Sequence, residues 1–206
     1  MPTLLNAYRR GIFPWYEQGQ PILWWSPATR AVLVPGREHL GRTLAKVFAR
    51  KRFDLTTNRA FDRVISACAA PRAGARGTWI TPQMRAAYLR LHRLGHAHSL
   101  ECWHQGELVG GLYGIQVGGI FCGESMFSSM ANASKAAFVA LSRTLARAGF
   151  DLVDCQVPNP HLQSLGVVAL SRGQFILRLE ASRDKMFPWP ASDDFAATAA
   201  MLGSKP

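Results

Sequence analysis

The stretch from His98 to Phe127 constrains the fold most, because its apolar residues lack the 3.6-residue period of a helix. Short apolar runs are separated here by glycine-containing turns, in the order SLECWH, Gln105–Gly106, ELVGGLYGIQV and GGIFCGESMF. Such runs predict strands, and two-residue turns between them predict hairpins. We therefore expect three antiparallel strands joined by tight turns.

A helix and a fourth strand are expected directly after these three strands. The segment ANASKAAFVALSRTLARAG places apolar residues at helical spacing and ends at Gly149. The short apolar run DLVDCQV then fits a buried strand. Three strands, a helix and a strand form the core order of GNAT-like acyltransferase folds, within the mixed α/β class. This is an analogy at the level of fold and fixes no function.

Further elements are expected on both sides of this core. Helical spacing with a capping threonine and a following proline predicts a helix that begins after Thr81 and ends at Gly95. The other predicted elements are a strand at Ala31–Val34, a helix from about Glu38 to Arg50, a strand at Phe53–Thr57, a helix at Ala60–Ala70 followed by a loop at Pro71–Gly77, and a helix at Ser171–Ala181.

The two ends of the chain differ from this core. The first residues gather aromatic side chains between prolines and glycines, which oppose a long helix. We expect an irregular, aromatic-rich lobe at residues 1–30, a catalytic domain at 31–185, and a loose tail at 186–206 that is rich in Ala, Ser and Pro.

Composition narrows the possible environments and partners. No apolar run reaches the roughly 20 residues of a spanning helix, and the N-terminus does not resemble a secretory signal. The four cysteines form no CxxC pair, so we expect no metal and read them as buried thiols of a reducing cytoplasm. The formal charge of +11 attracts polyanions, with RNA, DNA and anionic membranes all possible.

A basic stripe lies on the predicted helix at 38–50. Arg42, Lys46 and Arg50 recur every four residues and share one side of it. A stripe of this kind is either a solvated helix face or a ladder of cations for an RNA backbone. Spacing alone leaves both interpretations open.

Three polar residues at the DCQV strand could carry chemistry. Asp154 and Gln156 are two positions apart and point to one face of a strand, and Asn159 follows the strand. A carboxylate beside an amide can orient a nucleophile, although ordinary polar groups at a strand end fit the pattern too.

Glu124 and the tryptophans are further candidates. Glu124 lies among apolar residues and needs a partner, which is either a ligand's ammonium or amide group or an arginine of the same chain. Tryptophans such as Trp15, Trp24, Trp25 and Trp79 serve either as core anchors or as stacking platforms for bases.

The absence of a glycine-rich turn bears on whether acyl-CoA could be the acyl donor. An acyl-CoA enzyme holds pyrophosphate in a glycine-rich turn where a strand enters a helix. The equivalent junction here, SMFSSMANASK, contains no glycine. We find no serine triad, Walker loop or dinucleotide fingerprint and assign the histidines no chemistry.

Taken together, these segments resemble one family, the leucyl/phenylalanyl-tRNA–protein transferases. The resemblance runs in order from Tyr8 to about Glu180. It rests on eight segments: AYRRGIFPW, PILWWSP, GTWIT, LHRLGHAHSLE, ELVGGLYG, FCGESMFS, NASK and DCQVPNPHLQSLG.

The resemblance implies a GNAT-like domain with a small N-terminal lobe. It implies transfer of Leu, Phe and, less readily, Met from aminoacyl-tRNA to proteins that begin with Lys or Arg, which are then degraded. It further implies a cytoplasmic enzyme that needs no cofactor and no membrane, and we expect a monomer. The rival interpretations are an acyl-CoA N-acetyltransferase and a non-catalytic tRNA-binding module.

The resemblance also implies roles for individual residues. Asp154 and Gln156 match the catalytic positions, with Gln156 contacting the reacting groups and Asp154 orienting it. The positions that match the binding site for the aminoacyl-tRNA 3′ end are Tyr8, Trp15, Trp79, Tyr88, Leu112, Phe121, Glu124, Met126 and Asn159. Arg42, Lys46 and Arg50 match a basic helix that engages tRNA.

The N-terminus departs from the family pattern. Family members carry a segment with a GLLAxGGDL stretch before AYxRGIFPW, whereas this chain begins near the end of that region. We expect the N-terminal lobe to be truncated and the donor pocket to be more open as a result.

Overall fold

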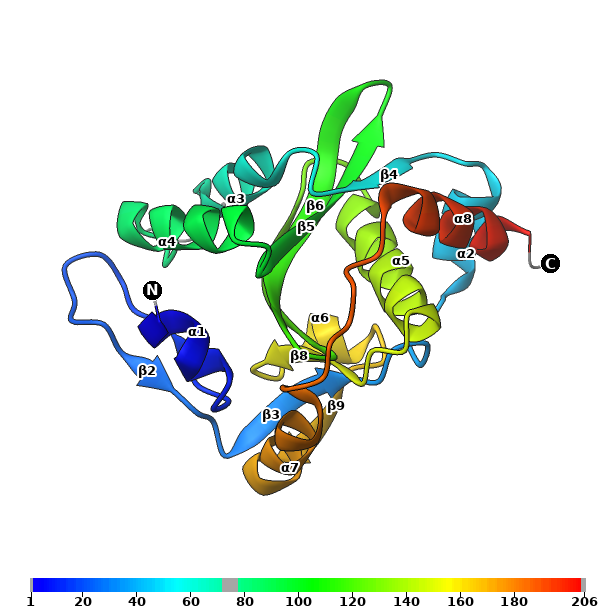
Figure 1. The fold of residues 1–206 in the computed structure, drawn as a ribbon. Coiled ribbons are helices and arrows are strands. Elements are labelled where there is room, and N and C mark those ends of the chain that lie inside the picture. The colour runs from blue at the N-terminus through cyan, green and yellow to red at the C-terminus, as the bar shows by residue number, and fades with distance from the viewer. Residues whose placement is uncertain (1, 72–77, 205–206) are drawn as a thin grey trace.

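A computed structural model describes residues 2–71 and 78–204 of the protein, and Figure 1 shows its fold. Seven strands of this part form one mixed sheet, in the order β4-β5-β6-β7-β8-β3-β9, and a separate ribbon joins β1 to β2. The strands are β1 (Phe13–Pro14), β2 (Trp24–Trp25), β3 (Thr29–Leu33), β4 (Asp54–Thr57), β5 (Ala97–His104), β6 (Glu107–Val117), β7 (Ile120–Ser128), β8 (Leu152–Gln156) and β9 (Val168–Ser171). The helices are α1 (Pro2–Tyr8), α2 (Arg42–Ala49), α3 (Phe61–Ala69), α4 (Pro82–Arg93), α5 (Ala133–Arg147), α6 (Pro160–Gln163), α7 (Arg172–Ser182) and α8 (Ser192–Gly203).

The predicted order of three strands, a helix and a strand is confirmed. Strands β5, β6 and β7 are antiparallel neighbours. Gln105 and Gly106 both have positive φ, at 52° and 80°, as the mirror-image turn of a tight hairpin requires. Helix α5 then crosses over to β8, which runs parallel to β7.

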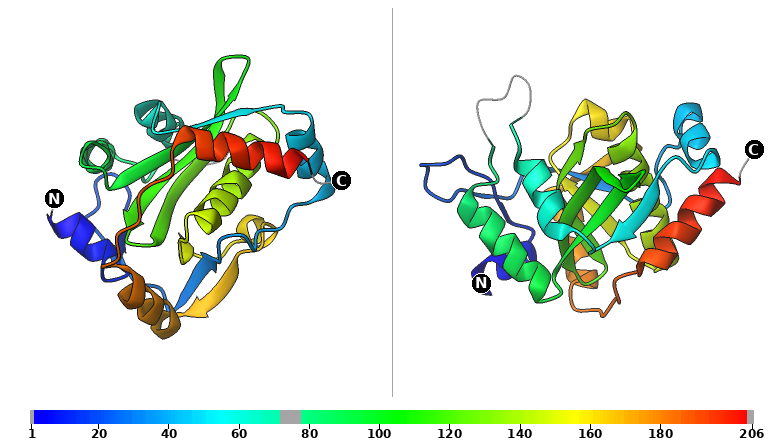
Figure 2. Two further views of the ribbon diagram at one scale, coloured as in Figure 1. Left: turned by 45° about the vertical axis from the view of Figure 1, so that its right-hand side comes forward. Right: turned by 90° about the horizontal axis from the view of Figure 1, so that it is seen from above.

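Two hydrophobic cores lie on either side of the sheet. Figure 2 shows the helices that cover the sheet. Side chains of α2, α5, α6 and α8 build the first core, which includes Leu44, Phe138 and Phe195. Side chains of α1, α3, α4 and α7 build the second core, which includes Ile65 and Tyr88. The sheet is therefore the middle of three layers.

The helix expected over 38–50 begins four residues later than predicted, at Arg42. Glu38 is buried, and its carboxylate binds the Ser142 hydroxyl and Arg143 of α5. The His39 N–H donates to the Leu165 carbonyl at 3.0 Å. These tertiary contacts hold the segment before α2 in a non-helical form, which the apolar spacing does not reveal.

The prediction of a loose C-terminal tail is wrong, because α8 packs on the first core. Phe195, Thr198 and Leu202 are buried, at a helical spacing that the abundance of Ala obscured. The preceding segment is also anchored, since Trp189 stacks on His98 with ring centroids 4.1 Å apart. Its indole N–H donates to Thr57 Oγ1 at 2.8 Å.

The N-terminal segment contains more regular structure than expected, namely α1 and the β1–β2 ribbon. Strand β9 at the sheet edge was not predicted, because Val168 and Ala169 are both exposed and give no alternation. Elsewhere the expected elements occur within one or two residues of their predicted bounds, and Thr81 Oγ1 caps α4 by accepting from the Met84 N–H at 3.2 Å. Of the loop expected at Pro71–Gly77, residues 72–77 lie outside the described residues.

Candidate functional site

The site begins where the parallel pairing of β7 with β8 ends. The last paired residues are Cys122 and Asp154, and each strand then carries one extra residue. In β7 the extra residue is Glu124, because Tyr113 pairs with Ser125 and the next residue of β6 pairs with Gly123. In β8 the extra residue is Cys155, because Ala31 of β3 pairs with Gln156 and the next residue, Val32, pairs with Asp154. Such bulges bend a strand and redirect side chains, so the two strands separate here.

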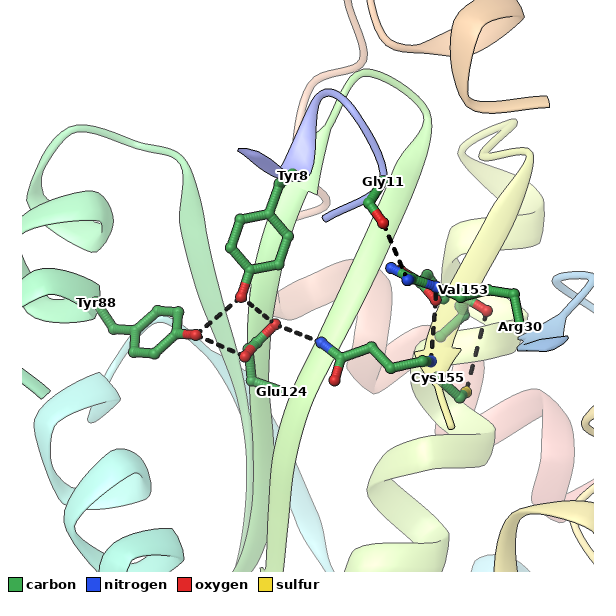
Figure 3. Close-up of polar contacts among 9 residues, drawn as sticks. Tyr8, Gly11, Arg30, Tyr88, Glu124, Val153 and Cys155 are labelled. Carbon is green, nitrogen blue, oxygen red and sulfur yellow. Dashed lines mark hydrogen bonds and ion pairs between the residues drawn. The ribbon is translucent and has the colours of Figure 1, made fainter. Parts of the chain in front are cut away.

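Glu124 is the centre of a hydrogen-bonded cluster (Figure 3). Its Oε1 accepts from the Tyr8 hydroxyl at 2.7 Å and from Gln156 Nε2 at 2.8 Å. Its Oε2 accepts from the Tyr88 hydroxyl at 2.6 Å, and the two tyrosine oxygens are 2.8 Å apart. Tyr8 comes from α1 and Tyr88 from α4, so the cluster ties both helices to the sheet.

Burial governs the protonation of this cluster. Desolvation raises the pKa of Glu124 to about 7, against the opposing effect of hydrogen bonds from the two tyrosines. Burial and the neighbouring Glu124 raise the pKa of both tyrosines, which stay neutral donors. Of the partners considered for Glu124 from the sequence, the arginine of the same chain is not found among the described residues, since tyrosine hydroxyls and the Gln156 amide bind the carboxylate.

Asp154 has a different partner, the buried Arg30 of β3. The guanidinium binds the carboxylate with two nitrogens, at 2.7 Å from Nε and 2.6 Å from Nη2, while its Nη1 donates to the Gly11 carbonyl at 3.1 Å. Arg30 is 2% exposed and Asp154 is fully buried. The rings of Phe13 and Phe175 flank the guanidinium, at 4.8 and 4.5 Å from its carbon.

Gln156 connects the two clusters. Its backbone N–H donates to Asp154 Oδ1 at 2.9 Å, and its side chain reaches Glu124. Its φ of 65° lies in the left-handed region, which a non-glycine residue adopts only when its surroundings hold it there. The Arg30–Asp154 pair therefore fixes the backbone that aims the Gln156 amide.

A cavity of about 430 Å³ opens between the separated strands. Gln156, Glu124 and Asn159 are among its polar lining residues, and Asn159 Oδ1 also caps α6 by accepting from the Leu162 N–H at 2.9 Å. The remainder is largely apolar. Its other lining residues are Phe13, Pro14, Trp15, Trp79, Leu112, Tyr113, Phe121, Gly123, Ser125, Met126, Phe138, Leu141, Val153, Cys155, Val157, His161 and Leu162.

The structure brings most of the predicted site residues to this cavity. Tyr8, Tyr88 and Asp154 do not line it. Instead, the two tyrosines bind Glu124 and Asp154 binds the Gln156 backbone. The predicted residues that line the cavity are Trp15, Trp79, Leu112, Phe121, Glu124, Met126, Gln156 and Asn159.

The basic stripe lies elsewhere. Arg42, Lys46 and Arg50 are exposed on α2, and none of them lines the cavity. Figure 1 shows α2 beside α8, on the opposite side of the molecule from α4 and β2. Any ligand that contacts both the cavity and this stripe must therefore be large.

Sequence reasoning missed Arg30, although one signal pointed to it. Asp154 is a carboxylate within an apolar strand and needs a cation. Arg30 immediately precedes the apolar run AVLV of a second strand, but nothing in the sequence shows that these two strands are neighbours. The bulges that redirect Glu124 and Cys155 also leave no sequence pattern.

The described residues also bear on three other possibilities: a metal site, a reactive cysteine and a membrane-spanning helix. No set of three or more His, Cys, Asp or Glu side chains is grouped to hold a metal ion. The four cysteines are unbridged, and burial raises the pKa of the Cys155 thiol. No helix in residues 2–71 and 78–204 is long and apolar enough to cross a membrane.

Comparisons with known proteins show which family the sequence matches. The family model for leucyl/phenylalanyl-tRNA protein transferase matches residues 32–180, and the model for the N-terminal domain of that family matches residues 1–28. Three relatives carry the name leucyl/phenylalanyl-tRNA–protein transferase. The protein from Shewanella woodyi is 55% identical over 181 residues, covering 88% of this chain and 77% of the relative. One from Pseudomonas aeruginosa is 57% identical over 182 residues, covering 88% and 80%, and one from Pseudomonas fluorescens is 53% identical over 188 residues, covering 90% and 83%.

Proposed function

Because the chain belongs to the leucyl/phenylalanyl-tRNA–protein transferase family, we propose that its cavity binds the aminoacyl end of Leu-tRNA or Phe-tRNA. The enzyme is an aminoacyltransferase that acts with tRNA on proteins, and the proposal concerns how this chain does so. The observation that carries it is that one cavity is lined mainly by apolar side chains together with the polar groups of Glu124, Gln156 and Asn159. The apolar side chains suit the donor side chain, and the polar groups suit the ester and the amines.

The apolar walls account for the choice of donor amino acid. Leu112, Phe121 and Met126 line the cavity, so a long side chain without a branch at Cβ gains the most contact there. Such a wall separates homologues by only about 1–3 kcal/mol per methylene. Transfer of Met, less readily than Leu or Phe, is therefore part of the proposal.

The two cavity tryptophans are proposed to hold the terminal adenosine. Trp15 directly follows β1 and Trp79 precedes α4, and both line the cavity. Stacking of a base on an aromatic ring contributes roughly 1–3 kcal/mol. The exposed stripe of Arg42, Lys46 and Arg50 would contact the tRNA backbone farther away.

The chemistry needs positioning more than activation, because the tRNA ester is already reactive. The acceptor's α-amine has an ordinary pKa of about 7.7–8.0, so a useful fraction is neutral in the cell. Its nitrogen attacks the ester carbonyl carbon, the new C–N bond forms, and the C–O bond to the ribose breaks. The proton lost by the amine ends on the ribose oxygen. The Cys155 thiol, whose pKa burial raises, stays protonated and need not form an acyl-enzyme.

In this scheme Gln156 is the catalytic residue and Asp154 a positioning residue. The Gln156 amide, which lines the cavity, would contact the reacting amine or carbonyl. Asp154, paired with Arg30, holds the Gln156 backbone and has no open path to substrate. Pre-oriented groups of this kind lower the barrier by fixing the reactants in place.

The acyl-CoA alternative is less well supported. The first N–H groups of α5 would have to bind pyrophosphate. Instead, the Ala133 N–H donates to the Met130 carbonyl at 3.1 Å and the Ser134 N–H to Ser128 Oγ at 3.3 Å. Ala133 also packs closely against Gly110 of β6, since a Cβ built on Gly110 would lie 2.6 Å from the Ala133 Cβ.

The proposal also covers properties that the family name does not specify: the acceptors, the oligomeric state, the location in the cell and the domain boundaries. The acceptors are proteins that begin with Lys or Arg, which are then degraded, and the enzyme acts as a monomer in the cytoplasm, where charged tRNA is found. Its fold is GNAT-like, with a catalytic domain at 31–185, a lobe at 1–30 and a C-terminal segment at 186–206. The parallel β7–β8 pair and its crossover helix support the fold assignment.

The test is a transfer assay with labelled Leu-tRNA and a peptide that begins with Arg. The expected result is a peptide one residue longer, with little product from a control peptide that begins with Ala. Gln156→Asn keeps an amide and tolerates the left-handed backbone, yet it is one methylene too short to reach Glu124. It should lower kcat roughly tenfold or more while leaving tRNA affinity within about threefold. Binding of tRNA without any product would favour a non-catalytic module.

A further inference from the structure

We propose that Trp24 and Trp25 form a second stacking site, which binds the nucleotide that precedes the terminal adenosine in the single-stranded 3′ end of the donor tRNA. The inference rests on the proposed function, since it extends the donor site beyond the cavity. Neither tryptophan lines the cavity or takes part in the Glu124 and Asp154 clusters.

Large apolar side chains are unusually exposed in this part of the chain. Five of them between residues 15 and 25 are 42–51% exposed: Trp15, Ile22, Leu23, Trp24 and Trp25. Side chains of this size are mostly buried in folded proteins, and a contiguous exposed group marks a binding surface. Figure 1 shows β2 at the edge of the molecule, beside α1 and away from α5 and α8.

Both tryptophans adjoin the wall of the cavity. The Trp25 ring lies beside that of Trp15, with centroids 5.8 Å apart, and its indole N–H donates to the Trp15 carbonyl at 2.8 Å. Trp24 is the cross-strand partner of Pro14. Trp15 and Pro14 are themselves cavity-lining residues. In this proposal, a nucleotide joined to an adenosine held at Trp15 leaves the cavity beside the ribbon that carries Trp24 and Trp25.

Charge favours a polyanion over an apolar segment of the acceptor. Residues 1–30 contain three arginines and one acidic residue, Glu17, within a chain of net charge +11. Arg30 is buried against Asp154 and Arg9 pairs with Asp184, whereas Arg10 is exposed. Arg172 of α7 also donates to the Pro27 carbonyl at 3.3 Å, which brings a guanidinium to the base of the ribbon. Stacked bases with phosphates near cations are the usual form of single-strand binding.

The experiment compares three donors in transfer to a peptide that begins with Arg. They are phenylalanyl-adenosine, the phenylalanyl ester of the trinucleotide CCA, and Phe-tRNA. Trp24→Ala should lower kcat/KM for the CCA ester and for Phe-tRNA by roughly tenfold, since one base loses its platform. The same variant should leave kcat/KM for phenylalanyl-adenosine within about twofold of wild type.

Two further variants separate stacking from other roles of the patch. Trp24→Phe retains an aromatic face and should restore most of the activity with the CCA ester. Leu23→Ala removes a neighbouring side chain of almost equal exposure without removing a ring, and should leave all three donors nearly unchanged.

Three outcomes would overturn the proposal. One is an equal effect of Trp24→Ala on all donors, which would mean action through Trp15 or the fold. Another is an equal loss in Leu23→Ala, which would indicate an apolar docking site. The third is a raised KM for a protein acceptor whatever the donor. If wild type transferred from none of the donors, the proposed function itself would fail instead.

Discussion

At the scale of single residues, two buried carboxylates of one site are stabilised in different ways. Asp154 is paired with a buried guanidinium that binds both of its oxygens. Glu124 has no cation among its described partners and relies on the Tyr8 and Tyr88 hydroxyls and the Gln156 amide. Neutral donors compensate desolvation less well than a charge does, so the pKa of Glu124 rises to about 7.

This difference predicts a pH dependence of stability. Between pH 4.5 and about 7 the folded protein retains a proton on Glu124 that the unfolded chain has released, so Glu124 lowers stability progressively as pH rises through that window. Glu124→Gln cannot titrate and should remove this component. Urea denaturation at pH 4.5 and 7.5 should show a smaller fall in the free energy of unfolding for the variant, by on the order of 2 kcal/mol. Equal falls in the two proteins would contradict the raised pKa.

The Arg30–Asp154 pair predicts strong coupling between two substitutions. Arg30→Met leaves a buried carboxylate without its cation and should cost about 3–5 kcal/mol of stability. Asp154→Asn in the same background removes the stranded charge and should recover part of that loss. A double-mutant cycle by chemical denaturation measures the coupling. Additive effects would mean that the pair does not act as a unit.

At the scale of elements, the site depends on where strands stop pairing. Strands β7 and β8 are joined up to Cys122 and Asp154, and one extra residue in each then turns side chains into the cavity. Helices α1 and α4 are held to this point through Tyr8 and Tyr88. Helix α2 takes no part in this arrangement, since its exposed cations do not line the cavity.

The α2 stripe predicts a change in the salt dependence of tRNA binding. Arg42→Ala with Lys46→Ala removes two exposed cations and should weaken binding, most at low salt. The slope of log affinity against log salt should become shallower by roughly 1.5. Affinity measured by filter binding between 50 and 200 mM salt tests this, with Arg178→Ala on the exposed face of α7 as the control. An unchanged slope would leave the stripe a solvated helix face.

At the scale of the whole molecule, one cavity is assembled from segments far apart in the chain. Its walls come from the β1–β2 ribbon, the segment before α4, strands β6, β7 and β8, and helices α5 and α6. Both cores contribute to it, since Phe138 belongs to the first and Phe13 to the second. A ligand in this cavity therefore contacts residues of both cores.

This arrangement predicts that a donor analogue stabilises the whole fold. A non-hydrolysable phenylalanyl-adenosine amide at 100 times its Kd should add about 2.7 kcal/mol, because it binds only the folded protein. Differential scanning calorimetry should show a Tm that rises with analogue concentration. An alanyl-adenosine amide is the matched control, and it should raise Tm less because it leaves the apolar walls unfilled. Equal shifts from the two analogues would argue against side-chain selection by the cavity.

The local pattern of the sequence determined the strands and helices of the core, their order, and the candidacy of Glu124, Asp154 and Gln156. Alternation, capping and turn residues act over a few positions, so they can be read along the chain. Only the tertiary structure decided that Arg30 meets Asp154, that two bulges open the cavity, and that the C-terminal residues form a packed helix. These features depend on which strands become neighbours and on what fills the space between layers, and local spacing along the chain does not reveal such long-range packing.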